Sequence, residues 1–214
     1  MTKGKTMDIL RRVSMGPEDE RQEVLRRHGV FFLDAEEVNR DEAGCFYRDI
    51  FFLVASGWAK EKPMWVVLNS PGGHADQGFA IHDTIRLLIA AGYTVNTCVL
   101  GEAASVAMMI LMAGTRRYAS PNTQFLLHQV SEEYIFLRVE TTEAEERSNE
   151  MKRINHVYLS AIAERSGMAL SDLTTQVRKK DFWLGAEEAL KYGQHGLIDE
   201  ICTTFPFMDA LQKS

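Results

Sequence analysis

The sequence has few cysteines and no excess of positive charge. Its three cysteines, Cys45, Cys98 and Cys202, lie far apart and form no CxxC pair, which indicates neither a disulfide framework nor a zinc site. Lys and Arg number 24 against 30 Asp and Glu, for a formal net charge of -6. That balance disfavours binding to nucleic acid or to anionic membranes, because no basic field attracts phosphate groups.

The sequence also lacks a long apolar segment. Its longest apolar run, 103–113, is too short for a bilayer-spanning helix, which needs about 20 residues. Residues 1–15 mix charged and polar side chains and lack the apolar centre of a secretory signal. We therefore expect a cytoplasmic protein in a reducing compartment.

The length and apolar content indicate one domain with flanking segments. With 214 residues and 45% hydrophobic content, the chain can bury one substantial core. We divide it into a poorly packed N-terminal arm (1–29), one domain (30–203) and a C-terminal tail (204–214). The arm is charged and contains Gly16-Pro17, a pair typical of turns.

Apolar patterning predicts strands that alternate with helices along the domain. Short apolar runs predict strands, and spacings of three and four residues predict helices. A T-x-x-E capping box at Thr142 and Glu145 predicts a long helix from Thr142 to about Ser166. The strands are expected at 30–33, 64–68, 94–100 and 123–127, and the other helices over 41–59, around 81–89 and from 105 to about 114. This alternation predicts an α/β fold with mostly parallel strands, whose ligands gather at the carboxyl ends of the strands.

Ser105 is the candidate nucleophile. Small residues over 101–105 allow a tight turn from a strand into a helix and leave the hydroxyl at the helix N-terminus. The unpaired N–H groups there can stabilise a developing oxyanion, and Val106 supplies the first of them. The alternative interpretation is that Ser105 caps its helix, as serine commonly does.

Three further residues could complete a serine-enzyme site. His128 ends a strand and could act as the base that a weakly nucleophilic serine requires, and Asp181 could orient it, although either could also be structural. Gly73 could let a substrate approach closely and donate a second hydrogen bond to the oxyanion, or it could form a plain turn. We predict no metal and no cofactor, because the other histidines lack metal-ligand spacing; these are His28, His74, His82, His156 and His195.

Four segments, in register, together resemble the Clp protease proteolytic subunit family. The first two are NSPGG at 69–73 and GEAAS at 101–105. The third is residues 117–129, which ends in LHQ, and the fourth is DFWL at 181–184 together with residues 188–193. The resemblance implies a crotonase-like (ClpP-type) α/β fold with repeated strand-helix units and a protruding handle helix. It also implies a catalytic triad of Ser105, His128 and Asp181, with Gly73 and Val106 as the oxyanion hole.

The same resemblance implies an assembly and partners. Members form heptameric rings, two of which stack as a tetradecamer around a proteolytic chamber, with the 142–166 helix between the rings. A partner unfoldase of the AAA+ class uses ATP and docks in apolar pockets, so the chain itself needs no cofactor. Trp65, Val67, Leu87 and Tyr118 lie where such pocket residues would be.

The sequence departs from the family pattern in several places. Ala107 replaces a glycine after the nucleophile turn, and Val130 replaces the proline usual after His-Gln. Residues 131–138 replace a glycine-rich strand that pairs with substrate, and the N-terminal arm lacks the axial-loop pattern. We therefore interpret the chain as a divergent member.

The predicted function is a serine endopeptidase that cleaves peptides or unfolded polypeptides inside a ring-shaped oligomer. Three alternatives are less favoured, because Ser105, His128 and Asp181 are all present; among them the phage maturation type stays open. One is a structural ring subunit without peptidase activity, and another is an acyl-CoA hydratase or isomerase of the crotonase type, which would use acidic catalysts. The third is a phage head-maturation or signal-peptide type of peptidase.

Overall fold

The chain is described by a computed structural model over residues 17–130, 141–178 and 180–212. These residues form a seven-stranded sheet in the order β1-β2-β3-β4-β7, with β5 beside β3 and β6 beside β5. All its pairs are parallel except β5 with β6. The strands are β1 Val30–Leu33, β2 Met64–Ser70, β3 Val95–Ala104, β4 Arg117–Ala119, β5 Gln124–Leu127, β6 Phe182–Gly185 and β7 Glu200–Ile201.

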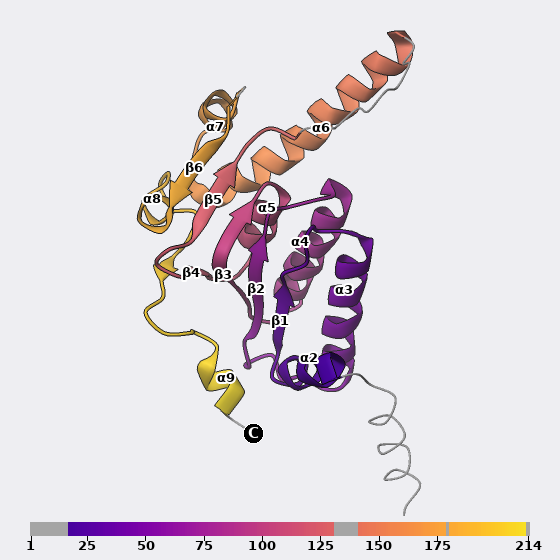
Figure 1. The fold of residues 1–214 in the computed structure, drawn as a ribbon, viewed down its shortest axis with the longest axis vertical. Helices are drawn as coiled ribbons and strands as arrows, with labels where there is room; N and C mark the ends of the chain where they lie inside the picture. The colour runs from indigo at the N-terminus through magenta and orange to yellow at the C-terminus, as the bar shows by residue number, and fades with distance from the viewer. Residues whose placement is uncertain (1–16, 131–140, 179, 213–214) are drawn as a thin grey trace, which may run out of the picture.

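Helices α3, α4 and α5 lie together on one side of the sheet, and α6 projects away from the body (Figure 1). The long helix predicted from Thr142 is α6, which begins one residue earlier. The helices are α2 Pro17–Arg27, α3 Arg40–Ala55, α4 Ala75–Ala90, α5 Val106–Ala113, α6 Thr141–Ser166, α7 Leu170–Gln176, α8 Ala186–Leu190 and α9 Met208–Gln212. Within the described ranges, no helix combines the length and apolarity that a membrane crossing requires.

Strand β3 is longer than the sequence indicated and changes partner along its length. It runs on through Gly101 to Ala104, where we had expected a turn. Gly101 has a φ of 96°, and Asn69 Oδ1 accepts a hydrogen bond of 3.2 Å from the N–H of Glu102, which holds an irregularity in the β2–β3 register. The first part of β3 pairs with β4 and the last part with β5, so the end of β3 lies beside the end of β5.

Two apolar clusters cover the two faces of the sheet. Successive side chains of a strand point to opposite faces, and on β2 the residues Met64, Val66 and Leu68 join the main core, whereas Trp65 and Val67 join a second cluster. Helix α5 lies wholly within the main core, with every residue buried.

The second cluster is covered by segments from the two ends of the chain. Phe207 is part of it, and Leu25 of α2 and Leu211 of α9 pack against it. Residues 17–29 are thus packed in part, where we had expected a poorly packed arm. The division at 29/30 and 203/204 itself stays a prediction.

A buried arginine attaches β7 and its preceding loop to β4. The Arg117 side chain is 3% exposed and forms an ion pair with Asp199 at 2.6 Å, and it also donates to the carbonyls of His195 and Gly196. Burial on its own would raise the pKa of Asp199, but the hydrogen bonds and charge of Arg117 outweigh it and hold that pKa below its usual value. This pair therefore stabilises the folded chain most where Asp199 is ionised.

Candidate active site

Ser105 occupies a strained turn between β3 and α5. Its φ of 55° and ψ of -128° fall in a region that side chains rarely adopt, and among the described non-glycine residues it alone has a positive φ. Such a conformation costs about 1–3 kcal/mol and persists where its surroundings hold it. Here the Ser105 N–H donates to the Leu126 carbonyl at 3.1 Å. The side chain makes no capping hydrogen bond, so helix capping does not account for the serine.

Two glycines let backbone segments pack directly against this turn. A Cβ on Gly72 would lie 2.6 Å from the Cβ and 3.3 Å from the Oγ of Ser105. A Cβ on Gly78, in the first turn of α4, would lie 2.0 Å from Cγ2 of Val106. From the sequence we made no prediction for Gly78. The available signal was a glycine inside a helical pattern, which usually has a packing reason.

Gly73 lies in an extended segment that pairs with Val38. The Val38 N–H donates to the Gly72 carbonyl at 2.7 Å, and the His74 N–H donates to the Val38 carbonyl at 2.8 Å. Because backbone groups of successive extended residues point to opposite sides, the Gly73 N–H points away from Val38. A side chain at Gly73, where φ is 151°, would meet the Val38 backbone at 2.5 Å.

The N–H of Val106 is a second available donor. Val106 is the first residue of α5, and the first N–H groups of a helix have no acceptor within it. Val106 itself is 4% exposed, so its position depends on the packing around it. The backbone donors of Gly73 and Val106 thus belong to the two segments that meet at Gly72 and Ser105.

The register of β5 and β6 brings the strand ends next to His128 and Asp181 together. In this antiparallel pair, Leu127 lies opposite Phe182, and His128 and Asp181 are the next residues beyond that last pair. Asp181 is exposed and His128 half-buried.

Ser105 joins these residues at the same edge of the sheet, because β3 pairs with β5 up to Ala104 and Leu126. In the described part of the chain, no side-chain hydrogen bond links Ser105, His128 and Asp181. Such bonds are often long or misaligned before substrate binds.

Of the four residues that we expect at a docking pocket, three are buried in the single chain. Trp65, Val67 and Tyr118 are 5%, 1% and 7% exposed, and the Trp65 ring lies 6.2 Å from that of Phe207. Leu87, by contrast, is 70% exposed. The assignment of a docking pocket to these four residues stays a prediction.

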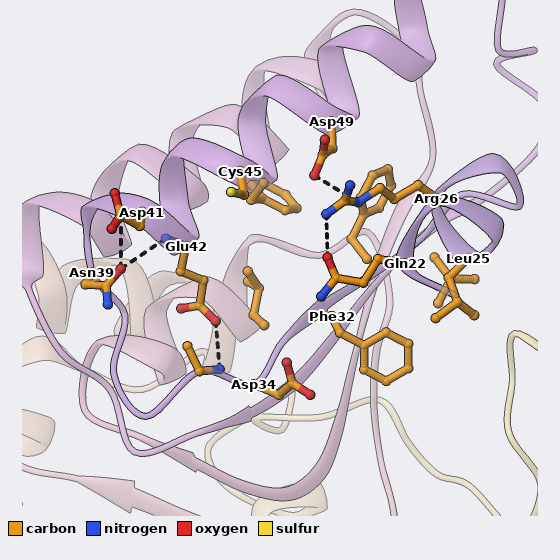
Figure 2. Close-up of a pocket in the computed structure, with 15 residues that line it drawn as sticks. Gln22, Leu25, Arg26, Phe32, Asp34, Asn39, Asp41, Glu42, Cys45 and Asp49 are labelled. Atoms are coloured by element: carbon orange, nitrogen blue, oxygen red, sulfur yellow. Dashed lines mark hydrogen bonds and ion pairs between the residues drawn. The ribbon is translucent and has the colours of Figure 1, made fainter. Parts of the chain in front are cut away.

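A cavity of about 330 Å³ lies elsewhere, between α2, β1 and α3. Figure 2 shows Arg26 of α2 reaching Asp49 of α3, with a contact of 2.9 Å, while Glu42 Oε1 accepts from the Ala35 N–H at 3.0 Å. Burial raises the pKa of Glu42. None of the described residues lining this cavity is a predicted site residue. We interpret the contacts around it as ones that hold α2 against α3.

The described residues contain no group of three or more His, Cys, Asp or Glu placed to hold a metal ion. The side chains and backbone of the proposed site offer a hydroxyl, an imidazole, a carboxylate and two N–H donors. This set is the one that serine peptidases use for acyl transfer.

Comparison with known proteins identifies the family. Residues 18–205 match the Clp protease family. The ATP-dependent Clp protease proteolytic subunit 2 of Chlamydia trachomatis is 33% identical over 171 residues, which cover 79% of this chain and 78% of that protein. The subunit of the same name from Treponema denticola is 32% identical over 161 residues, covering 74% and 76%.

A solved structure agrees with these sequence matches. A ClpP1 mutant from Listeria monocytogenes aligns with a TM-score of 0.73 and 25% sequence identity, over 90% of this chain and 99% of that one. The chain belongs to the Clp protease family and has the ClpP-type α/β fold, as the sequence predicted. Its function is that of a peptidase of this family, whereas the roles of individual residues stay predictions.

Proposed function

We propose that this chain is a serine endopeptidase in which Ser105 is the nucleophile, His128 the general base and Asp181 the residue that orients His128. The observation that carries the proposal is the conformation of Ser105, a strained, uncapped serine at the start of a buried helix. Strain at a serine whose side chain makes no capping hydrogen bond is the pattern of a functional turn, because the hydroxyl gives the helix no support in return.

In the proposed reaction, His128 takes the Ser105 proton as Oγ attacks the carbonyl carbon of the scissile bond. The oxyanion accepts hydrogen bonds from the N–H groups of Gly73 and Val106. His128 then gives its proton to the leaving amine, which breaks the C–N bond and leaves an ester on Ser105. Water, deprotonated by His128, attacks that ester and releases the acid product and the free serine. No step requires a cofactor.

The proposal includes a ring-shaped oligomer that encloses these sites and admits peptides or unfolded polypeptides. Exposed apolar side chains on α3 and α4 support self-association: Phe51, Phe52 and Leu87 are 52%, 62% and 70% exposed. Large apolar residues gathered on a surface usually mark an interface. We propose stacked heptamers, with α6 between the two rings.

The described relatives are proteolytic subunits of ATP-dependent proteases, so we also propose an AAA+ unfoldase that consumes the ATP. A cytoplasmic location, without nucleic-acid or membrane partners, fits the net charge of -6. Because Phe207 covers Trp65, this partner would have to displace the C-terminal segment to reach the second apolar cluster.

The test of the nucleophile is labelling with a fluorophosphonate probe, followed by peptide mass spectrometry. We expect one adduct, on Ser105, that is lost in Ser105→Ala and retained in Ser56→Ala, a control whose hydroxyl donates to the Phe52 carbonyl at 2.8 Å. Asp181→Asn should slow labelling by about 10⁴-fold, as loss of the orienting carboxylate does in other triads.

Labelling at another serine, or unchanged labelling in Ser105→Ala, would show that the assignment is wrong. An assembled ring that no probe labels would favour the structural-subunit alternative.

A further inference from the structure

We propose that a cavity between α4, the end of α6 and the start of β4 binds a phosphoryl group, either as free phosphate or as the phosphate chain of a larger molecule. The cavity has a volume of about 560 Å³. None of its lining residues belongs to the proposed catalytic site. The inference therefore goes beyond the proposed function and does not depend on it.

Arginine is the main charged residue of this cavity. Its lining includes four arginines but only two carboxylates, in a chain whose formal net charge is -6. The arginine cavity, as we name it, is thus a local exception to the acidic character of the chain. Its arginines and carboxylates are Arg86, Arg116, Arg117, Arg165, Glu164 and Asp199.

Two of the four arginines are neutralised by direct contacts with carboxylates. Arg117 forms an ion pair with Asp199 at 2.6 Å, and it also donates to backbone carbonyls. Arg116 forms an ion pair with Glu200 at 3.0 Å, while its guanidinium lies 5.1 Å from the centre of the Tyr118 ring. These contacts account for two of the positive charges by the fold alone.

Arg165 is held in place by backbone carbonyls rather than by a carboxylate. Its Nε donates to the Met112 carbonyl at 3.0 Å, and its Nη2 donates to the Gly114 carbonyl at 2.7 Å. These bonds satisfy the end of α5, which is a structural role for this side chain. In the described part of the chain it has no ion-pair partner. A guanidinium has five N–H donors, so others remain to bind a ligand from this fixed position.

Arg165 also lies among like charges. Burial lowers its pKa, and the charges of Arg117 and Arg86 lower it further, whereas nearby carboxylates offset this only in part. A guanidinium stays protonated in proteins, so the folded chain carries the repulsion. A bound anion would relieve it, because it gives these cations a shared counter-charge.

Arg86 has no structural role that explains its place beside Arg165. It is exposed on α4, and the described residues provide it with no hydrogen bond and no ion pair. An exposed arginine by itself is ordinary solvated surface. Next to a second guanidinium that is already fixed, it completes a pair of cationic donors around one cavity.

The number of donors favours a phosphoryl group over a carboxylate. One guanidinium fork is enough to bind a carboxylate through two parallel hydrogen bonds. A phosphoryl group carries about two negative charges and has three acceptor oxygens, which match Arg86 and Arg165 together with the N–H groups of Arg116 that its ion pair leaves free. The cavity volume lies in the range of small-molecule sites, about 300–1,000 Å³, and so admits a longer phosphate chain as well.

The experiment titrates the full-length chain with phosphate, tripolyphosphate, ATP and malonate by isothermal titration calorimetry, at constant ionic strength and without divalent cations. Malonate is the carboxylate control among the ligands. The variants are Arg86→Gln and Arg165→Lys. Arg40→Gln is the matched control variant, because Arg40 is also an exposed helical arginine but lines a different cavity.

We expect one saturable site per chain for phosphate, and weaker binding of malonate. Arg86→Gln should weaken phosphate binding by about 10-fold or more, the loss expected for a hydrogen bond between charged groups, without lowering the thermal unfolding midpoint of the unliganded chain. Arg165→Lys should also weaken binding, because lysine keeps the charge but lacks the planar fork. Arg40→Gln should bind phosphate as the intact chain does.

The three phosphoryl probes distinguish the source of the ligand. Equal affinities identify free phosphate, tighter binding of tripolyphosphate identifies a phosphate chain, and ATP binding that is tighter still identifies a nucleotide. The inference is overturned if the folded intact chain binds none of the three saturably, or if malonate binds as tightly as phosphate. It is also overturned if Arg86→Gln binds phosphate as tightly as the intact chain, which is the result of a general salt effect, since that acts equally on every variant.

Discussion

Gly78→Ala should damage the active site from a neighbouring helix. Gly78 lies in the first turn of α4, and a methyl group there would be 2.0 Å from Cγ2 and 3.1 Å from Cβ of Val106. An ordinary contact begins at 3.4 Å, so Val106 would have to move by more than an ångström. Val106 is buried and β-branched, which restricts its rotation, and it follows Ser105 directly. The movement therefore reaches the nucleophile and the proposed oxyanion donor.

Two opposing terms set the stability of this variant. Alanine in a helix is about 1 kcal/mol better than glycine, whereas forcing a methyl group into a packed core costs about 1–3 kcal/mol. Because the clash is severe and its neighbour cannot rotate away, we expect a net loss of about 1–2 kcal/mol. A displacement of about 1 Å at a reacting group can cost about 100-fold in rate, and we expect Ser105 labelling to slow by that order.

The matched control is Gly44→Ala. Gly44 also lies within a helix, α3, but its added methyl would meet only the end of the flexible Arg48 side chain, at 3.1 Å. We expect this variant to be neutral or more stable by up to about 1 kcal/mol, with unchanged labelling. Urea unfolding measures the stabilities, and the double variant Gly78→Ala/Val106→Ala should recover part of the loss. Equal stability and equal labelling in Gly78→Ala and Gly44→Ala would refute this reasoning.

Three further predictions concern strain, charge and packing. Ser105→Gly should raise the free energy of unfolding by about 1 kcal/mol, because glycine tolerates the positive φ, and Ser105→Ala should not; chemical denaturation of both inactive variants decides. Asp199→Asn should cost about 3–5 kcal/mol at neutral pH, because it leaves Arg117 buried without a counter-charge. Because the folded-state pKa of Asp199 is lowered, the ionised carboxylate stabilises the folded chain above about pH 4, and this stabilisation is lost as pH falls through the folded-state pKa. The free energy of unfolding should therefore fall less steeply with pH below about pH 4 in the variant than in the intact chain. Phe207→Ala should lower the free energy of unfolding by about 3 kcal/mol, as loss of a buried ring does. Phe205→Ala should change it by less than about 0.5 kcal/mol. Equal losses of stability in the two variants, measured by thermal unfolding, would contradict the packing of Phe207 against the second apolar cluster.

Local patterns in the sequence determined the fold class and the order of the main elements. The strand at Val30–Leu33 and the long helix ending at Ser166 lie where periodicity and capping residues placed them. These features depend on neighbouring residues, through side-chain alternation and helix-end hydrogen bonds, which a linear sequence records. The four motifs in order were also enough to identify the family, because their residue types and spacing are a property of the chain.

What the sequence could not supply depends on contacts between distant residues. Nothing near Gly101 shows that β3 continues past it, because Asn69, 32 positions earlier by the numbering of the chain, holds the bulge. Helix periodicity cannot show that Gly78 touches Val106, since the two belong to different helices.

For the candidate site, too, some features could be predicted from the sequence and others depend on the tertiary structure. The sequence determined which residues could be nucleophile, base and orienting acid, and also the small residues that permit a turn at Ser105. Only the tertiary structure decided that Leu127 and Phe182, the neighbours of His128 and Asp181, are paired. It also decided that Ser105 is strained and makes no capping hydrogen bond, and that the ring of Phe207 lies against that of Trp65. Sheet register and the packing of the two ends of the chain bring these residues together, and both arise from long-range pairing that no local segment specifies.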